Sequence, residues 1–301
     1  MPTRTDASLR ALHFYGPRAR PVRVRSAAAA RIAGVLLLLA AGCAGNSSVE
    51  RGLDRAGGGI SYAFDGARTE SRTFAVALDG IVDVDVQTFG GDVVLRSGHG
   101  PAGTASIEAT VAARHGGNRT KEADAALGTV ELTAQLRRGG DVPTLEVRAT
   151  TTSAEPWLLR TDIDVTLPEM RRVRVHTRSG KVHVYENRGG VLVETTDGDI
   201  RVLTPWAITE DVTLVTKGKD IVFRAYTGTC GTVDIDCVNG EVLSRVEAGD
   251  WRIVDSRNDH DTLHATLGTC NNTLRMRNVD AKVIFSVVKK PMEYGTFFVS
   301  P

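Results

Sequence analysis

One short pattern occurs four times between residues 173 and 244, and it constrains the fold more than any other feature of the chain. Each copy has two short runs in which Val, Ile or Leu alternates with polar residues, separated by a turn. The copies begin 18, 21 and 21 residues apart, at Val173, Val191, Val212 and Val233. A repeat period of this size is typical of an architecture in which similar units stack on one another.

The alternation assigns one face of each copy to the interior. Successive side chains of a strand point to opposite sides, so Val173, Val175 and Thr177 share one face while Arg174 and His176 share the other. One copy alone cannot cover its apolar face, and neighbouring copies must therefore stack. A period of 18–21 residues equals two short strands and two connections, which predicts a β-solenoid.

Stacked coils place equivalent residues about 4.8 Å apart, so the repeat also predicts columns. We expect a small polar column and an apolar column in the interior: Thr177, Thr195, Thr216 and Cys237, and Val175, Val193, Leu214 and Ile235. The turns should contain Gly180, Gly198, Gly218 and Gly240, with Gly218 shifted by one place because Lys219 takes the equivalent position. Glycine is expected there because a sharp corner needs a positive φ.

The pattern continues in weaker form on both sides of the four copies. Residues 82–95 form an early version, and residues 251–267 and 274–287 can be aligned with the repeat. Asn258 and Asp280 would form their turns, since Asn and Asp tolerate the left-handed conformation. The clearest coils thus span residues 162–287, and the aromatic ending 292–299 is expected to cover the last open edge.

The section before the repeats also reads as β-strands, although residues 98–160 are irregular. Predicted strands span residues 73–78, 81–86, 93–96, 104–113, 130–136, 145–151 and 161–167. Only residues 121–127 have helix-forming composition. A doubly wound parallel sheet would need helices between its strands, so the fold class is all-β, with a less regular N-terminal section.

Residues 1–43 are predicted to be an export signal. Five arginines between residues 18 and 31 precede the apolar run 32–41, which is about half as long as a membrane-spanning helix. The small residues before Cys43 resemble the lipobox of bacterial lipoproteins, which implies lipidation of Cys43. An ordinary signal peptide with an incidental Cys43 is the alternative. Because Ala44 is not Asp, the same resemblance favours the outer membrane in a Gram-negative cell.

Residues 44–72 have the composition of a flexible tether, which leaves residues 73–301 as the folded domain. Residues 1–43 hold seven arginines and one acidic residue, so 30 basic and 35 acidic residues give the remainder a net charge of −5. Nucleic-acid binding would need a basic footprint, and we expect no such partner.

Residues 165–184, with the turns Thr196-Asp-Gly-Asp-Ile200 and Val238-Asn-Gly-Glu-Val242, resemble the bacterial putative-adhesin β-solenoid domains. Members of that family carry a Val-Pro step and repeated Thr-x-Ser-Gly-Asp-Ile-like turns between valine-rich strands. The resemblance implies an extracytoplasmic repeat domain, often on a lipoprotein, without established catalytic residues.

Two patterns could carry chemistry. Acidic residues follow the turn glycines at Asp92, Asp199, Asp220 and Glu241. Stacked carboxylates could bind calcium, but Asp after Gly is ordinary turn chemistry and Lys181 interrupts the column, so we expect no metal. The histidines have no metal-ligand spacing, and no nucleophile elbow, phosphate loop or dinucleotide fingerprint occurs, so we expect no catalytic residues and no cofactor.

Three cysteines remain after Cys43. Gly-Thr-Cys occurs at residues 228–230 and 268–270, which makes a Cys230–Cys270 disulfide attractive in an exported protein. If the two cysteines lay two coils apart, their separation of about 9.6 Å would exceed the disulfide limit of about 7 Å. Cys237 is expected to be a buried thiol.

Three functions remain open from the sequence. The first is a non-enzymatic, lipid-anchored cell-envelope protein that presents a β-solenoid surface for adhesion or for binding a protein or glycan. The second is an exported β-helix enzyme that acts on polysaccharide. The third is a structural or regulatory envelope component without an external ligand.

Overall fold

The computed structural model describes residues 67–255 and 260–293. The described residues all belong to one compact unit. The predictions for the signal peptide, Cys43, most of the tether, the Asn258 turn and residues 294–299 lie outside these ranges. Within them, no helix is long and apolar enough to cross a membrane.

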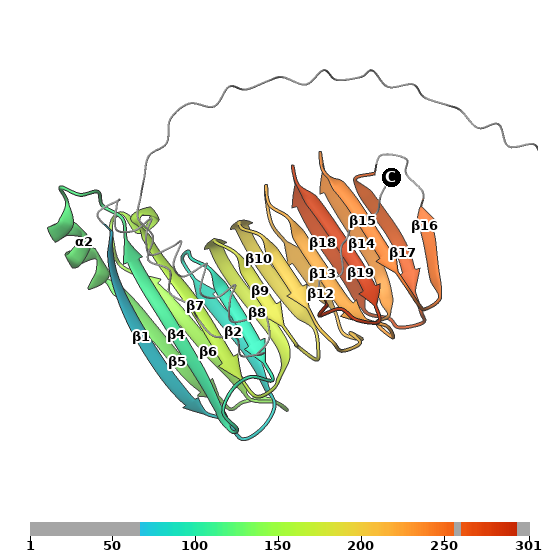
Figure 1. Ribbon diagram of the computed structural model, residues 1–301, viewed down its shortest axis with the longest axis horizontal. Coiled ribbons are helices and arrows are strands. Elements are labelled where there is room, and N and C mark those ends of the chain that lie inside the picture. The colour runs from blue at the N-terminus through green and yellow to red at the C-terminus, as the bar shows by residue number, and fades with distance from the viewer. Residues whose placement is uncertain (1–66, 256–259, 294–301) are drawn as a thin grey trace, which may run out of the picture. The chain divides into compact units, whose positions relative to one another are not determined.

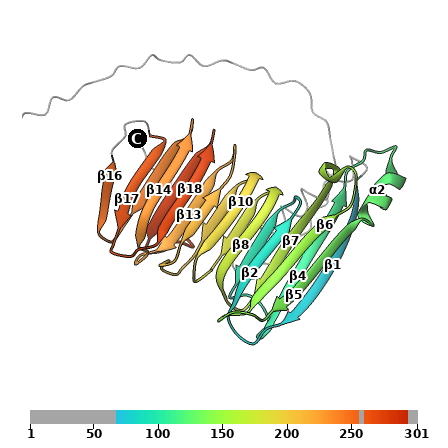
Figure 2. The same cartoon turned by 180° about the vertical axis from the view of Figure 1, so that it is seen from behind.

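The described residues form an all-β structure of two mixed sheets (Figures 1 and 2). In spatial order, the nine-stranded sheet contains β1 (Arg68–Ala77), β4 (Thr104–Ala113), β7 (Leu159–Leu167), β3 (Val93–Ser97), β9 (Val182–Tyr185), β11 (Ile200–Leu203), β13 (Ile221–Tyr226), β19 (Lys282–Val288) and β15 (Glu241–Val246). The ten-stranded sheet contains β16 (Trp251–Asp255), β17 (Thr262–Leu267), β14 (Gly231–Val238), β18 (Thr273–Val279), β12 (Val212–Val215), β10 (Val191–Asp197), β8 (Met170–Ser179), β2 (Val82–Thr88), β6 (Thr144–Thr151) and β5 (Val130–Arg137).

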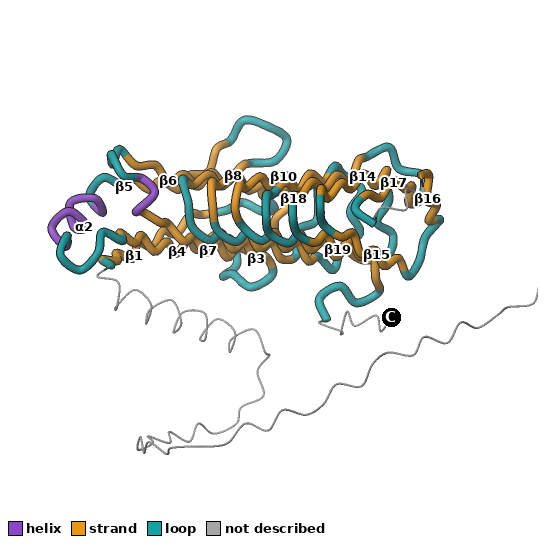
Figure 3. Tube along the Cα trace, turned by 90° about the horizontal axis from the view of Figure 1, so that it is seen from above, coloured by secondary structure: helices purple, strands orange, loops and turns teal. Residues whose placement is uncertain are grey.

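Each copy of the repeat contributes one strand to each sheet, and the two sheets face one another as two layers (Figure 3). The first three copies pair in parallel and in the predicted register: Val191 lies between Val173 and Val212, and Ile200 lies between Val182 and Ile221. The early copy joins the same stack, because β2 pairs with β8 and β3 with β9.

The fourth copy does not follow the third in space, and here the predicted columns are wrong. The β18–β19 pair lies between β12–β13 and β14–β15, so Met276 separates Leu214 from Ile235. In the small polar column, the neighbour of Cys237 is likewise Asn278, and not Thr216 as the repeat predicted. A later pair can take this position because every coil offers the same parallel hydrogen-bonding edge to its neighbour.

Residues 251–267 do not form a further coil, which corrects a second prediction. They form an antiparallel hairpin, β16 with β17, and β17 pairs antiparallel with β14. The alternation of apolar residues is the same in parallel and antiparallel strands, so the pattern alone could not distinguish the two arrangements. Asp280 does adopt the left-handed conformation predicted for its turn, with φ of 60°.

The N-terminal section follows most of the predicted strands, but β1 begins at Arg68, so residues 68–72, which the composition assigned to the tether, are part of a strand. They are held there by antiparallel pairing with β4. Strand β4 has the predicted bounds, and α2 (Thr120–Leu127) lies where helix-forming composition was found. Strands β6 and β7, joined by the short 3₁₀-helix η1 (Pro156–Leu158), pair in parallel with β2 and β3. The irregular residues 98–160 therefore contribute one more pair to the stack, flanked by the antiparallel strands β1, β4 and β5.

The core between the two sheets is made mainly of Val, Leu and Ile side chains that are almost fully buried. Its largest members lie at the C-terminal end of the stack, where the Phe223 ring stacks on Phe285 and Trp251 stacks on the other side. Burying one such side chain contributes about 1.5–3 kcal/mol, so the repeated interior positions supply most of the stability.

Candidate functional site

The turns from the ten-stranded to the nine-stranded sheet contain the predicted glycines, but not for one common reason. Gly180 and Gly218 have positive φ, of 111° and 74°. Gly198 does not, and a Cβ there would lie 1.8 Å from the carbonyl oxygen of Gly180. A Cβ on Gly240 would lie 1.9 Å from the carbonyl oxygen of Ala281. A Cβ on Gly180 would likewise lie 2.2 Å from the carbonyl oxygen of Gly91. Gly180, Gly198 and Gly240 therefore permit close approach of neighbouring coils, Gly218 is required only by its positive φ, and all four glycines have a structural role.

The small polar column beside these turns is also structural. Thr177 donates a hydrogen bond to the carbonyl of Ser179, and Thr216 donates to that of Gly198. The side-chain amide of Asn278 donates to the carbonyl of Lys219, and the thiol of Cys237 donates to the carbonyl of Ala281. These four members of the column therefore satisfy corner carbonyls, which would be costly to bury unpaired, whereas the buried hydroxyl of Thr195 makes no such hydrogen bond. Burial raises the pKa of the Cys237 thiol, as expected of a buried cysteine.

The acidic residues after the turns bind the backbone of the next coil. The Asp92 carboxylate accepts a hydrogen bond from the backbone N–H of Lys181 at 2.7 Å. In the same way, Asp199 accepts from the N–H of Asp220 at 3.2 Å, and Asp220 accepts from the N–H of Lys282 at 3.0 Å. Glu241 pairs with the Lys282 ammonium at 3.0 Å. This arrangement favours turn chemistry over calcium binding for the acidic column.

The outward charges of the ten-stranded sheet form pairs across neighbouring strands. The largest group centres on Asp234, whose carboxylate lies 2.5 Å from Arg277, 3.3 Å from Arg275 and 3.2 Å from His264. Partial burial alone would raise the pKa of Asp234, but the Arg277 hydrogen bond and the surrounding positive charge lower it overall. These side chains stabilise one another and keep Asp234 ionised. An ionised carboxylate has no proton to donate, so Asp234 is unsuited to act as a general acid.

His183, on the outer face of the nine-stranded sheet, makes stability depend on pH. Burial, and then the charge of Arg201 in the adjacent strand, lower its pKa to about 4. An unfolded histidine titrates near 6.5, so the unfolded chain binds the proton first as the pH falls. Stability should therefore fall from pH 6.5 to about 4, by about 3 kcal/mol, and then level off with respect to this group.

Urea unfolding of the His183→Gln variant across this pH range checks the prediction. The His183→Gln variant should lose most of the decrease in stability between pH 6.5 and pH 4. The matched control is His176→Gln, because the His176 side chain is 63% exposed. An unchanged slope in His183→Gln would contradict the assignment.

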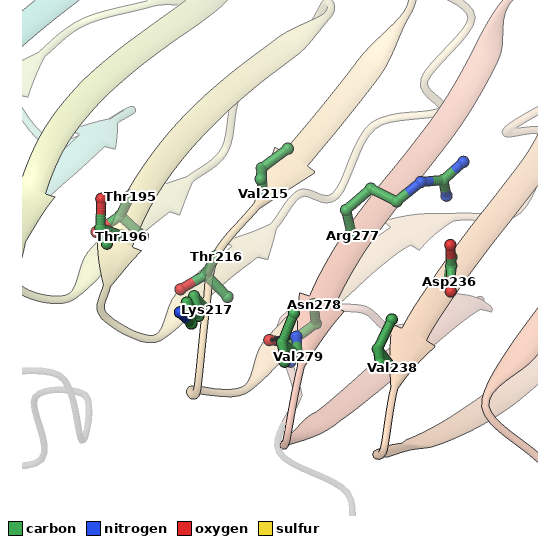
Figure 4. A pocket seen from close by; sticks show the side chains of 10 residues that line it. All are labelled: Thr195, Thr196, Val215, Thr216, Lys217, Asp236, Val238, Arg277, Asn278 and Val279. Atoms are coloured by element: carbon green, nitrogen blue, oxygen red, sulfur yellow. Dashed lines mark hydrogen bonds between the residues drawn. The ribbon is translucent and has the colours of Figure 1, made fainter.

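A shallow hollow of about 390 Å³ lies on the ten-stranded sheet next to the turns (Figure 4). Its lining comes from the ends of β10, β12, β18 and β14: Thr195, Thr196, Val215, Thr216, Lys217, Asp236, Val238, Arg277, Asn278 and Val279. Arg277 is already bound to Asp234, and Thr216 and Asn278 bind corner carbonyls. These three side chains are therefore already engaged in contacts within the fold.

The structure joins Cys230 and Cys270 in a disulfide with a Cα–Cα distance of 5.4 Å. The register that the sequence left open explains this distance, because β14 and β18, the strands that follow the two cysteines, are direct neighbours. The bridge fixes the segment that crosses from β13 past β19 to β14.

The opposite edge of the stack carries a group of exposed side chains that the sequence analysis missed. We call the segments 168–169, 186–190, 204–211 and 227–230, which connect the nine-stranded to the ten-stranded sheet, the loop edge. Trp206 lies in this edge, and Tyr226, the last residue of β13, lies directly before its fourth segment; each side chain is 42% exposed. The Arg188 guanidinium lies 4.1 Å from the centre of the Trp206 ring, and its Nε is 2.6 Å from Glu169. These four residues form the loop-edge ladder.

Two buried threonines hold the ladder in place. The Thr204 hydroxyl donates to the carbonyl of Asn187 and accepts the N–H of Trp206, which joins the loops that carry Arg188 and Trp206. Thr229 donates to the carbonyl of Tyr226 and accepts the N–H of Ile208. The Tyr226 N–H also donates to the carbonyl of Trp206 at 3.2 Å. The exposed aromatic rings thus project from fixed backbone.

A signal for the ladder was present in the sequence. Arg188 and Trp206 each follow the last inward valine of their copy by four residues, and Tyr226 follows Phe223 by three. Aligning the connections as well as the strands would have placed them in one column.

No protein-family model matches the chain, and no curated protein matches it in sequence. Among solved structures, it is similar to a putative cell adhesion protein from Clostridium sporogenes, with a TM-score of 0.41 and 12% identity over 74% of this chain and 100% of that chain. A putative adhesin from Bacteroides fragilis gives a TM-score of 0.28 and 9% identity over 72% and 97% of the two chains. A putative adhesin from Parabacteroides distasonis gives 0.22 and 9% over 73% and 97%.

Proposed function

We propose that this protein is an exported, lipid-anchored, non-enzymatic component of the bacterial cell envelope, whose β-solenoid presents a binding surface to a protein or glycan partner. The observation that carries the proposal is the parallel, in-register pairing of the repeats in both sheets. Such pairing arranges outward residues in columns about 4.8 Å apart on rigid backbone. A rigid and regular surface lowers the entropy cost of holding an extended partner.

The use of polar groups supports binding over catalysis. Among the described residues, the carboxylates that follow the turns bind the backbone of the next coil, and Asp234 is held by two arginines. An enzyme that hydrolyses polysaccharide generally uses a pair of carboxyl groups on either side of the scissile bond, and one of them has a raised pKa. Burial raises the pKa of the Asp162 carboxyl, but Asp162 accepts a hydrogen bond from the backbone of Asp92 and pairs with Arg160, so it is bound within the fold.

Membrane anchoring through Cys43 is tested with the full chain in a bacterial host. The wild-type protein should enter the detergent phase with the membrane fraction, and Cys43→Ala should be released in the aqueous phase, because a lipid chain supplies the membrane affinity. The Cys237→Ala variant is the cysteine control. If Cys43→Ala still enters the detergent phase, the anchor is wrong.

Surface presentation is tested by adding protease to intact cells and by pull-down from detergent-solubilised envelope. We expect cleavage of the anchored chain on intact cells and specific capture of an envelope protein or glycan. A chain that is protected on intact cells and captures nothing would favour a structural component without an external ligand.

A further inference from the structure

We propose that the loop-edge ladder is a binding site for a linear, neutral polysaccharide, with Trp206 and Tyr226 as stacking platforms and Arg188 with Glu169 as hydrogen-bonding groups. The inference rests on the proposed function and names the chemical class of its partner.

The first argument is the chemistry of the exposed groups. A pyranose ring has an apolar C–H face and a rim of hydroxyl groups. Trp206 and Tyr226 offer an apolar ring with one polar N–H or O–H at the tip, so they match both parts of a sugar. Each is 42% exposed, although large aromatic side chains usually bury most of their surface. Aromatic faces with a few well-placed polar groups are the usual composition of a ligand site.

The second argument is spacing along the stack. Glu169, Arg188 and Trp206 lie in three successive connections, and Tyr226 is the last residue of β13. Strands β9 and β11, which lead to Arg188 and Trp206, and β13, which carries Tyr226, are direct neighbours in the nine-stranded sheet. Neighbouring strands are about 4.8 Å apart, a length similar to one pyranose unit of an extended chain. A polymer that repeats at this interval can meet one side chain per coil, whereas a peptide strand has no such match.

The third argument is charge. The Arg188 guanidinium is paired with Glu169 at 2.6 Å while it lies flat over Trp206 at 4.1 Å. The pair cancels its own charge, and both groups keep hydrogen-bonding capacity, because a guanidinium has five N–H donors and a carboxylate about four acceptor sites. Such a site favours neutral hydroxyl groups over sulfate or uronate.

The fourth argument is preorganisation. Buried Thr204 and Thr229 tie the three loops together, and Arg188 holds one face of the Trp206 ring, so little ordering remains to be done on binding.

The test is affinity electrophoresis and tryptophan fluorescence of the full chain with mixed-linkage β-glucan, xylan and soluble chitin oligosaccharides, and with dextran sulfate as an anionic probe. We expect binding to at least one neutral probe. Trp206→Ala should weaken it about tenfold or more, and Tyr226→Ala and Arg188→Gln should weaken it about threefold to tenfold. Trp206→Tyr should retain most of the binding.

Trp157→Ala is the matched control, because Trp157 is 68% exposed but lies on η1, away from the loop edge. It should bind as the wild type does, and the melting temperature of every variant is measured to show that it is folded. Failure of all neutral probes, binding of dextran sulfate alone, or full binding by folded Trp206→Ala would overturn the proposal. Capture of an envelope protein that Trp206→Ala leaves intact would overturn it while the proposed function stands.

Discussion

Replacing Cys230 and Cys270 together by serine should lower the free energy of unfolding by about 4 kcal/mol. The disulfide closes a loop of 40 residues, and restricting a loop of this length in the unfolded chain accounts for that magnitude. The bridge also fixes the connection from β13 to β14. This connection passes the position that β18 and β19 occupy between the third and fourth copies of the repeat.

Urea unfolding of the double variant, followed by circular dichroism, measures this effect. Reduced wild-type protein should unfold at the same urea concentration as the double variant, and the reductant should not change the double variant further. A variant at Cys237 serves to separate loss of the bridge from loss of a buried thiol. Equal midpoints for oxidised and reduced wild-type protein would show that the bridge does not stabilise the fold.

Gly198→Ala should destabilise the protein by about 3 kcal/mol or more, because the new methyl group would overlap the carbonyl oxygen of Gly180 at 1.8 Å. The overlapped atom is backbone, and strands β8 and β12 hold β10 in register on both sides, so neither coil can move away cheaply. Gly218→Ala is the matched control. Its φ of 74° costs about 1 kcal/mol with alanine, but its Cβ would meet open space.

Thermal and urea unfolding of both variants distinguishes the two causes. We expect Gly198→Ala to lose far more stability than Gly218→Ala. The opposite order would mean that the positive φ at Gly218 costs more than the overlap of the new methyl group with Gly180 at Gly198.

The sequence was most informative about interior faces. Alternation placed Val173, Val191 and Val212 in one buried column, and the structure has this column in the predicted register. Side-chain alternation is a local property of extended backbone, so it can be read without knowledge of the partner strand. The same locality explains the errors: residues 251–267 alternate like a coil but pair antiparallel.

The candidate site was harder to predict from the sequence than the interior faces. The sequence drew attention to the turn glycines and the acids after them, which proved to join one coil to the next. Trp206 and Arg188 lie in connections of different length, and only the stacking of those connections shows that the guanidinium covers the indole ring. Contacts between loops depend on the neighbouring coil and leave no periodic signal in either loop alone.

The sequence by itself determined that similar β-strand pairs stack, which side chains they bury and where their corners lie, because these follow from strand geometry and repeat period. Only the tertiary structure decided the order of the stack. The β18–β19 pair takes its place between β12–β13 and β14–β15 because every coil offers an equivalent parallel edge, and backbone hydrogen bonds do not distinguish one neighbour from another. Side-chain packing and the Cys230–Cys270 bridge select one order among those that the backbone allows.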